Sequence, residues 1–132
     1  MAEFPEAVRL VYRDFPLDFH AGARPAAEGA RCAAVMGRFW EYHDLLFVAQ
    51  PEFSRDQLVG YAARLGLDRT AFASCLDSGR FRAAVDADIN EGRARGVRGT
   101  PTFFVNGRRL VGAQPIETFR EAIRDALEDA RK

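Results

Sequence analysis

The stretch from Gly99 to Gly107 constrains the fold more than any other part of this sequence. A Thr-Pro step leads into the mainly apolar run Thr102–Val105, and an Asn-Gly pair follows it. Asn-Gly is a preferred pair for a two-residue type I′ turn, because both central positions need positive φ. The pattern therefore predicts a hairpin in which Thr102–Val105 pairs with Arg108–Val111. Pro101 is compatible with the start of a strand, and the isomer of its peptide bond stays open here.

A further strand is predicted near the beginning of the chain. Val8–Phe15 is rich in β-branched and aromatic residues, and Pro16 ends the run. Because apolar side chains occur on both faces of this segment, it belongs inside a layered α/β sheet.

Four helical segments are predicted in the sequence between this strand and the hairpin. The first is a long region that begins near Pro25 and continues through Phe47 at three- and four-residue apolar spacing. Two others begin at capping residues and end at glycines: Ser54 with Gln57 to Gly66, and Asp68 to Gly79. The fourth holds Phe81, Val85 and Ile89 and stops at Gly96. A last helix opens at Pro115 and carries Phe119, Ile123 and Leu127 on one stripe.

Size and composition exclude several classes of protein. A chain of 132 residues with 48% hydrophobic and 29% charged residues fits one ordinary globular domain. Nineteen basic residues balance nineteen acidic ones, which argues against nucleic acid or an anionic membrane as the partner. No apolar run approaches the roughly 20 residues of a membrane span. Residues 1–6 lack the features of a signal peptide, so the chain as written is expected in the cytoplasm.

Three stretches of the chain resemble the DsbA-like family of thioredoxin-fold proteins. They are Val8-Arg9-Leu10-Val11-Tyr12-Arg13-Asp14-Phe15-Pro16-Leu17, Gly37-Arg38-Phe39-Trp40-Glu41-Tyr42-His43-Asp44-Leu45-Leu46-Phe47, and Gly99-Thr100-Pro101-Thr102-Phe103-Phe104-Val105-Asn106-Gly107 with the residues that follow to Pro115. The similarity covers essentially the whole chain, in the order that the family has.

The resemblance implies an α/β fold, in which a thioredoxin-like sheet carries an inserted helical domain. A single domain over 1–132 would have its helical insertion at about 18–96, with 8–17 and 97–132 as the remaining core. The family's first β-strand, its Cys-x-x-Cys and most of its first helix have no counterpart in this sequence. Without that strand, we expect the isolated chain to be marginally stable, to form a homodimer or strand-swapped dimer, or to pair Val8–Phe15 directly with Thr102–Val105.

Members of this family are mostly bacterial, extracytoplasmic thiol–disulfide oxidoreductases that act on protein thiols. By resemblance, Gly99, Thr100 and Pro101 would bind an extended substrate, and no cofactor is implied. Because the catalytic Cys-x-x-Cys is absent, we expect no dithiol exchange by this chain alone. Two other functions remain open: a non-catalytic peptide-binding module on the same fold, and a relative of the glutathione-dependent isomerases.

The two cysteines of the chain, Cys32 and Cys75, stand far apart in the sequence. Their residue types allow either a disulfide or two buried thiols. Neither lies at a predicted helix N-terminus, so neither gains a thiolate-stabilising dipole, and the family resemblance implies a structural disulfide. A zinc site would have to join them to His20 and His43, but the paired short spacings of zinc ligands are missing. We therefore expect no metal and interpret His43 as a packing residue.

One basic cluster borders the Thr-Pro step. Arg93, Arg95 and Arg98 precede it closely. The simplest interpretation of the cluster is a solvated basic face.

Overall fold

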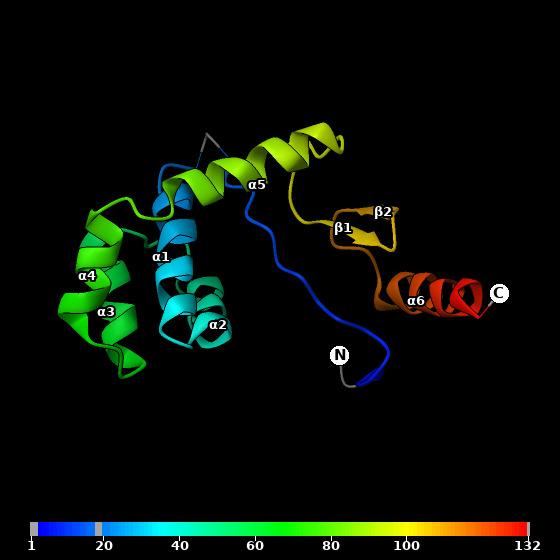
Figure 1. Cartoon of the computed structure of the whole chain (residues 1–132), viewed down its shortest axis with the longest axis horizontal. Coiled ribbons are helices and arrows are strands. Elements are labelled where there is room, and N and C mark those ends of the chain that lie inside the picture. Colours follow the sequence, from blue (N-terminus) through cyan, green and yellow to red (C-terminus); the bar gives the residue numbers. More distant parts are fainter. Residues whose placement is uncertain (1–2, 18–19, 132) are drawn as a thin grey trace. The chain divides into compact units, whose positions relative to one another are not determined.

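The computed structural model describes residues 3–17 and 20–131, and these residues form two compact units (Figure 1). The hairpin unit consists of residues 3–13 and 92–131, and the helical unit is Asp14–Glu91. The bounds 1, 18 and 132 of the predicted division lie outside the described residues. No helix in the described part of the chain combines the length and apolar character needed to cross a membrane.

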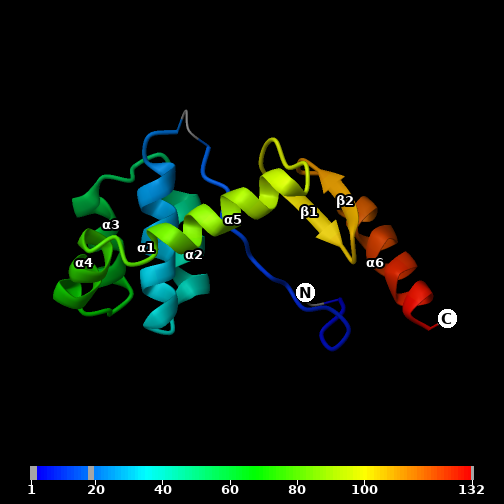
Figure 2. The ribbon, with the colours of Figure 1, turned by 45° about the horizontal axis from the view of Figure 1, so that its top comes forward.

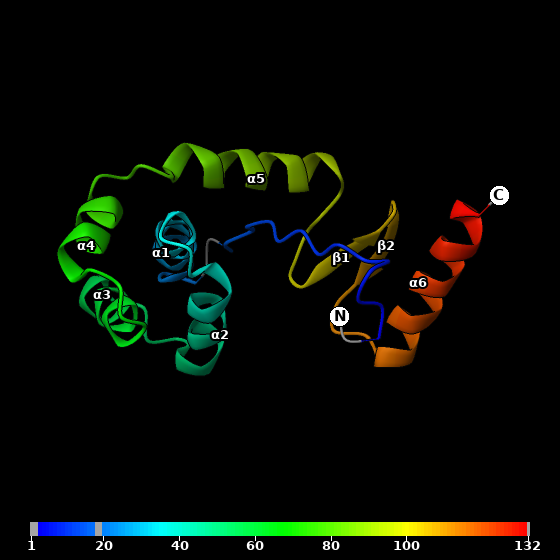
Figure 3. The ribbon, with the colours of Figure 1, turned by 60° about the horizontal axis from the view of Figure 1, so that its bottom comes forward.

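The described residues of the helical unit form four whole helices and most of a fifth. They are α1 (Ala23–Val35), α2 (Phe39–Ala49), α3 (Arg55–Arg64), α4 (Arg69–Asp77) and α5 (Arg82–Ala94), the last of which continues into the hairpin unit. Figure 3 looks nearly along α1 and shows α2 beside it and α3 beside α4.

The long helical region predicted from Pro25 through Phe47 is in fact two helices. Gly37 separates them at φ +78°, a conformation that side chains with a Cβ rarely adopt. The N–H of Gly37 donates to Ala34, and that of Arg38 donates to Ala33 at 2.9 Å, which satisfies carbonyls at the end of α1. The apolar period continues across this break, and periodicity alone therefore missed it.

Side-chain caps begin α3 and α4 where the sequence predicts them. The Ser54 hydroxyl accepts from the Gln57 N–H at 3.2 Å, and the Gln57 side chain accepts from the Ser54 N–H at 3.0 Å. The Asp68 carboxylate accepts from the Ala71 N–H at 2.8 Å. These bonds satisfy N–H groups that lack a partner within the helix, so both caps are confirmed.

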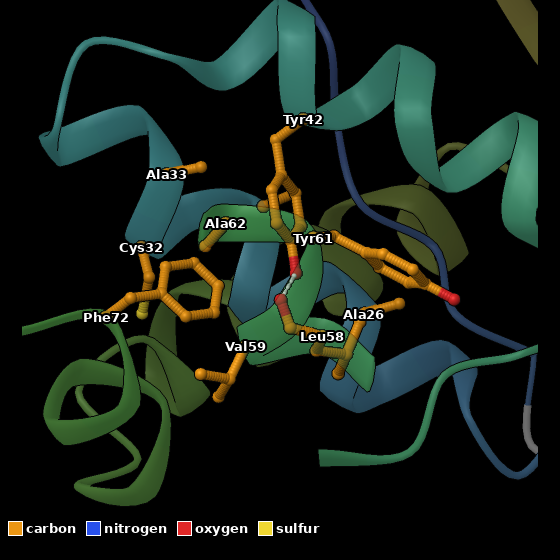
Figure 4. Packing of buried hydrophobic residues seen from close by; sticks show 10 residues of the cluster. Ala26, Cys32, Ala33, Tyr42, Leu58, Val59, Tyr61, Ala62 and Phe72 are labelled. Atoms are coloured by element: carbon orange, nitrogen blue, oxygen red, sulfur yellow. Dashed lines mark hydrogen bonds between the residues drawn. The ribbon is translucent and has the colours of Figure 1, made fainter. Parts of the chain in front are cut away.

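The core of the helical unit forms around two rings, Tyr42 from α2 and Phe72 from α4 (Figure 4). Both are fully buried, and their centroids lie 5.3 Å apart. The Tyr42 hydroxyl donates to the Leu58 carbonyl at 2.9 Å, which gives this buried polar group a partner. Cys32, Ala33, Leu58, Val59, Tyr61 and Ala62 pack around the rings.

The hairpin unit has the hairpin that the Asn-Gly pair predicts. Strand β1 (Thr102–Val105) pairs antiparallel with β2 (Arg108–Val111), in the register that places Val105 opposite Arg108. Asn106 and Gly107 take φ values of 49° and 93°, as a type I′ turn requires. Helix α6 (Ile116–Ala130) begins after Pro115 and runs beside the hairpin (Figure 2).

The prediction of a strand over Val8–Phe15 is wrong for this structure. The segment has no regular secondary structure, and the sheet of the described residues contains only β1 and β2. The expected direct pairing with Thr102–Val105 is therefore absent too. A strand is held by its neighbour, and no third strand offers a backbone ladder here. Leu10 and Val11 are consequently 52% and 53% exposed.

Candidate peptide-binding edge

One long edge of β1 has no neighbouring strand among the described residues. The carbonyl of Pro101 accepts from the Gly112 N–H at 2.8 Å, so this carbonyl points toward β2. Backbone groups of successive strand residues point to opposite sides. Phe103 and Val105 therefore bond across the hairpin, and the N–H and C=O groups of Thr102 and Phe104 point to the open edge.

The predicted binding residues Gly99, Thr100 and Pro101 lead directly into this edge. Thr100 and Pro101 are exposed, and Gly99 is half-buried. The Thr102 hydroxyl donates to the Gly99 carbonyl at 2.7 Å, which ties the turn to the first residue of β1. The Thr100–Pro101 bond, whose isomer the residues left open, is cis, as is Gln50–Pro51.

The two faces of the hairpin differ in chemistry. On the face toward α6, the rings of Phe103 and Phe119 meet edge to face at 4.8 Å, and Leu110 is buried. Phe104 lies on the opposite face, paired in register with Arg109. The Arg95 guanidinium lies 5.5 Å from the centroid of the Phe104 ring. One face is thus apolar, and the other is aromatic with two neighbouring guanidinium groups.

The hairpin unit buries few apolar side chains. Leu110 and Ala122 are the buried hydrophobic residues among those described in it, whereas Val111 and Ile116 are 59% and 61% exposed. Phe103 and Val105 are half-buried. A hairpin with one helix leaves part of its apolar surface in water, which makes an edge of this kind receptive to another chain.

The two cysteines belong to the helical unit. Cys32 of α1 and Cys75 of α4 form a disulfide within the helical unit, with Cα atoms 6.0 Å apart. Cys32 is 1% exposed, and no free thiol remains among the described residues. Both sulfurs therefore hold helices together and neither is available as a nucleophile or a metal ligand in this form.

The histidines do not join the cysteines. The His43 ring meets Trp40 edge to face at 5.3 Å and Phe47 at a tilt at 4.8 Å, and its Nδ1 lies 3.0 Å from an Asp44 carboxylate oxygen. His20 is exposed. Within residues 3–17 and 20–131, no three His, Cys, Asp or Glu side chains gather as a metal site would require.

The structure also contains a buried charged cluster that the sequence patterns did not indicate. Arg31 of α1 donates to Asp14 and to Asp88 of α5, each at 2.6 Å, and the Asp14 N–H donates to Asp88 at 2.9 Å. Burial raises the pKa of Asp14, as does the nearby Asp88 charge, while the Arg31 hydrogen bond lowers it. Asp14 lies within the predicted strand Val8–Phe15 and Arg31 lies beside Cys32, and only the fold brings them together.

A family model described as thioredoxin matches residues 5–125 of the chain. The match covers both units of the structure, including the segment 8–15 and the hairpin.

Similar chains occur inside much longer proteins. One relative, named Na(+)/H(+) antiporter NhaA 3, from Salinispora tropica, is 44% identical over 126 residues, which are 95% of this chain and 19% of that protein. A protein from Salinispora arenicola, named Na(+)/H(+) antiporter NhaA 1, is 42% identical over 94% of this chain and 19% of its own length. Another from Herminiimonas arsenicoxydans, named Na(+)/H(+) antiporter NhaA, is 40% identical over 89% of this chain and 18% of its own length. The chain thus spans about a fifth of the length of these curated relatives.

Proposed function

The chain belongs to the thioredoxin family, and from this premise we propose that it is the substrate-docking part of a DsbA-type thiol–disulfide oxidoreductase domain. Gly99, Thr100 and Pro101, with the open edge of β1, would hold an extended segment of a protein substrate. The substrate would add a strand to the hairpin through main-chain hydrogen bonds.

The open edge of β1 is the observation that carries this proposal. Thr102 and Phe104 direct their N–H and C=O groups away from β2, and the sheet of the described residues has no third strand to bind them. An extended peptide presents the same groups at the same spacing, so it satisfies them without any change in the hairpin. The exposed Thr100 continues the edge beyond the strand.

Binding of a polypeptide and exchange of disulfides require different groups in this chain. Thiol–disulfide exchange begins when a thiolate attacks a disulfide sulfur, and a second thiol then resolves the mixed disulfide. The sequence contains no Cys-x-x-Cys, and its two cysteines are joined to each other in the helical unit. We therefore propose that this chain alone binds polypeptide and does not exchange disulfides.

Peptide binding is tested most sharply at Phe104, where two substitutions separate the backbone from the ring. Phe104→Pro removes the N–H that points to the open edge, and proline is tolerated at such an edge because the hairpin bonds are not involved. Phe104→Ala removes the same ring and keeps the N–H. Fluorescence anisotropy with a labelled, neutral extended peptide measures both.

We expect Phe104→Pro to weaken binding well beyond Phe104→Ala. Circular dichroism establishes that both variants keep the helices and the hairpin. Equal binding by the two variants would show that the edge backbone is not the docking site. Absence of peptide binding by the parent chain would refute the proposal altogether.

The catalytic half of the proposal has its own assay. Insulin reduction with dithiothreitol as the electron donor is expected to proceed at the uncatalysed rate in the presence of this chain. Acceleration that disappears in Cys32→Ala or Cys75→Ala would contradict it and assign catalysis to these cysteines.

The relatives support a second proposal, which concerns the protein that this domain associates with. Because 95% of this chain is 44% identical to part of a protein named as a Na(+)/H(+) antiporter, we propose that the domain associates with an antiporter of that kind. The test is binding in trans to the detergent-solubilised Salinispora tropica protein from which the matching 126 residues have been deleted. Failure to bind that protein, when the undeleted protein is stable in the same detergent, would count against the association.

A further inference from the structure

Positive charge is concentrated around the open edge. Between Gly92 and Ile116 the sequence has no aspartate or glutamate, although the whole chain has a net charge of zero. The same stretch contains these arginines: Arg93, Arg95, Arg98, Arg108 and Arg109. The hairpin and the segment that leads into it are therefore strongly cationic, and the rest of the chain carries the compensating excess of acidic residues.

Two of these arginines are exposed, and no carboxylate of the described residues neutralises their charges. Arg98 is exposed two residues before Thr100, and no carboxylate of the described residues pairs with it. Arg109 donates to the Gly96 carbonyl at 3.3 Å, which is a neutral acceptor, and it too lacks a carboxylate partner within the described part of the chain. Both guanidinium groups keep their full charge at this surface.

Arg108 and Arg109 lie on opposite faces of the hairpin. Arg108, on the α6 face of the hairpin, pairs with Asp125 at 3.2 Å. On the other face, Arg109 stands beside Phe104 in the strand register, and Arg95 covers the Phe104 ring. Close to the open edge, a half-buried aromatic ring is thus flanked by guanidinium groups.

We propose that the open edge of β1 selects acidic polypeptide segments. The inference rests on the proposed docking function and adds the class of substrate. The peptide backbone would bond to Thr102 and Phe104, an apolar side chain would contact the Phe104 ring, and Asp or Glu side chains would face Arg98 and Arg109. A nucleic acid fits less well, because it lacks the alternating N–H and C=O groups that a strand edge binds.

The exposed Arg98 and Arg109 would act on an acidic peptide through exposed ion pairs, and added salt screens such pairs. Exposed pairs contribute modestly, so two of them should favour an acidic peptide over an uncharged one by about five- to tenfold at low salt. The preference should shrink as added salt shortens the screening length. A cationic peptide should bind more weakly than the uncharged one.

The experiment compares three labelled peptides that differ only in the residues at alternate positions: Glu, Gln or Lys. Anisotropy titrations at low and high salt measure their affinities for the whole chain. The double variant Arg98→Gln, Arg109→Gln should lose most of the preference for the Glu peptide. Arg69→Gln is the matched control, because Arg69 is also exposed and has no carboxylate partner among the described residues, but it belongs to the helical unit.

Each outcome decides between the two proposals. Equal affinity for the Glu and Gln peptides overturns the acidic preference and leaves peptide docking in place. Binding of none of the peptides overturns docking, and the acidic preference with it. Tighter binding of a single-stranded oligothymidine than of the Glu peptide, dependent on Arg98 and Arg109, would assign the cationic face to nucleic acid instead.

Discussion

Reduction of the Cys32–Cys75 disulfide is expected to remove a large part of the stability of the helical unit. The bond joins α1 to α4 across 43 positions of sequence, and the closed loop contains all of α2 and α3. In the unfolded chain, a cross-link of this length restricts many conformations. The loop-closure relation for about 43 residues gives roughly 4 kcal/mol of stabilisation at room temperature.

This magnitude is large compared with the stability of an ordinary small domain, about 5–15 kcal/mol in total. Other contacts also hold these helices: the rings of Tyr42 and Phe72 join α2 to α4, and the Tyr42 hydroxyl donates to the Leu58 carbonyl. We therefore expect the reduced chain to keep its helices in native buffer and to unfold at a lower denaturant concentration. For a urea dependence of about 2 kcal/mol per molar, the midpoint should fall by roughly 2 M.

The assay is urea unfolding followed by far-ultraviolet circular dichroism, with and without dithiothreitol, and with free thiols counted in each sample. The double variant Cys32→Ala, Cys75→Ala is the control and should be insensitive to reductant. It should also be slightly less stable than the reduced parent, by about 1 kcal/mol, because Cys32 is buried and alanine leaves part of its volume empty. Equal midpoints for the oxidised and fully reduced parent would refute the loop-closure reasoning.

Four further substitutions probe single features of the helical unit. Tyr42→Phe should lower the free energy of unfolding by about 1 kcal/mol, because it removes the buried bond to Leu58; no change in urea unfolding would contradict this. Gly37→Ala should lower the free energy of unfolding by about 1 kcal/mol because of the φ of +78°, whereas Gly60→Ala inside α3 should raise it by about 0.5–1 kcal/mol. No atom lies near either new Cβ, so steric contact does not explain the difference. A higher melting temperature for Gly37→Ala than for Gly60→Ala would contradict this reasoning. Burial raises the pKa of Asp14, so above pH 3.8 the folded chain loses this proton less readily than the unfolded chain does, and the stability contributed by this group falls as the pH rises above that ordinary pKa of 3.8. Asp14→Asn should flatten that part of the pH profile of unfolding, and an unchanged slope would argue against the raised pKa.

Local signals in the sequence predicted local structure well. The hairpin follows from Asn106-Gly107, and the starts of α3 and α4 follow from Ser54 and Asp68, because each of these features depends on hydrogen bonds or φ angles within a few residues. Apolar periodicity did not predict the division of α1 from α2 at Gly37. The apolar spacing continues through it, and an isolated glycine does not by itself end a helix.

The candidate site was predicted in part for the same reason. Gly99, Thr100 and Pro101 stand next to a hairpin that the sequence specifies, so their position at its entry could be predicted. That the edge of β1 has no neighbouring strand could not be predicted. Val8–Phe15 has the composition of a strand, but a strand exists only where a second backbone meets it, and composition does not say whether one does.

The sequence by itself determined the family resemblance, the hairpin with its cationic flank, the capped helices and the absence of a Cys-x-x-Cys pair. Only the tertiary structure decided that Cys32 meets Cys75, and that Asp14 and Arg31 meet Asp88 across 74 and 57 positions of sequence. It also decided that Phe104 and Arg109 share a face beside an open strand edge. The physical reason is range: turns and caps form between near neighbours, whereas disulfides, buried ion pairs and sheet edges need residues that the chain brings together only when it folds.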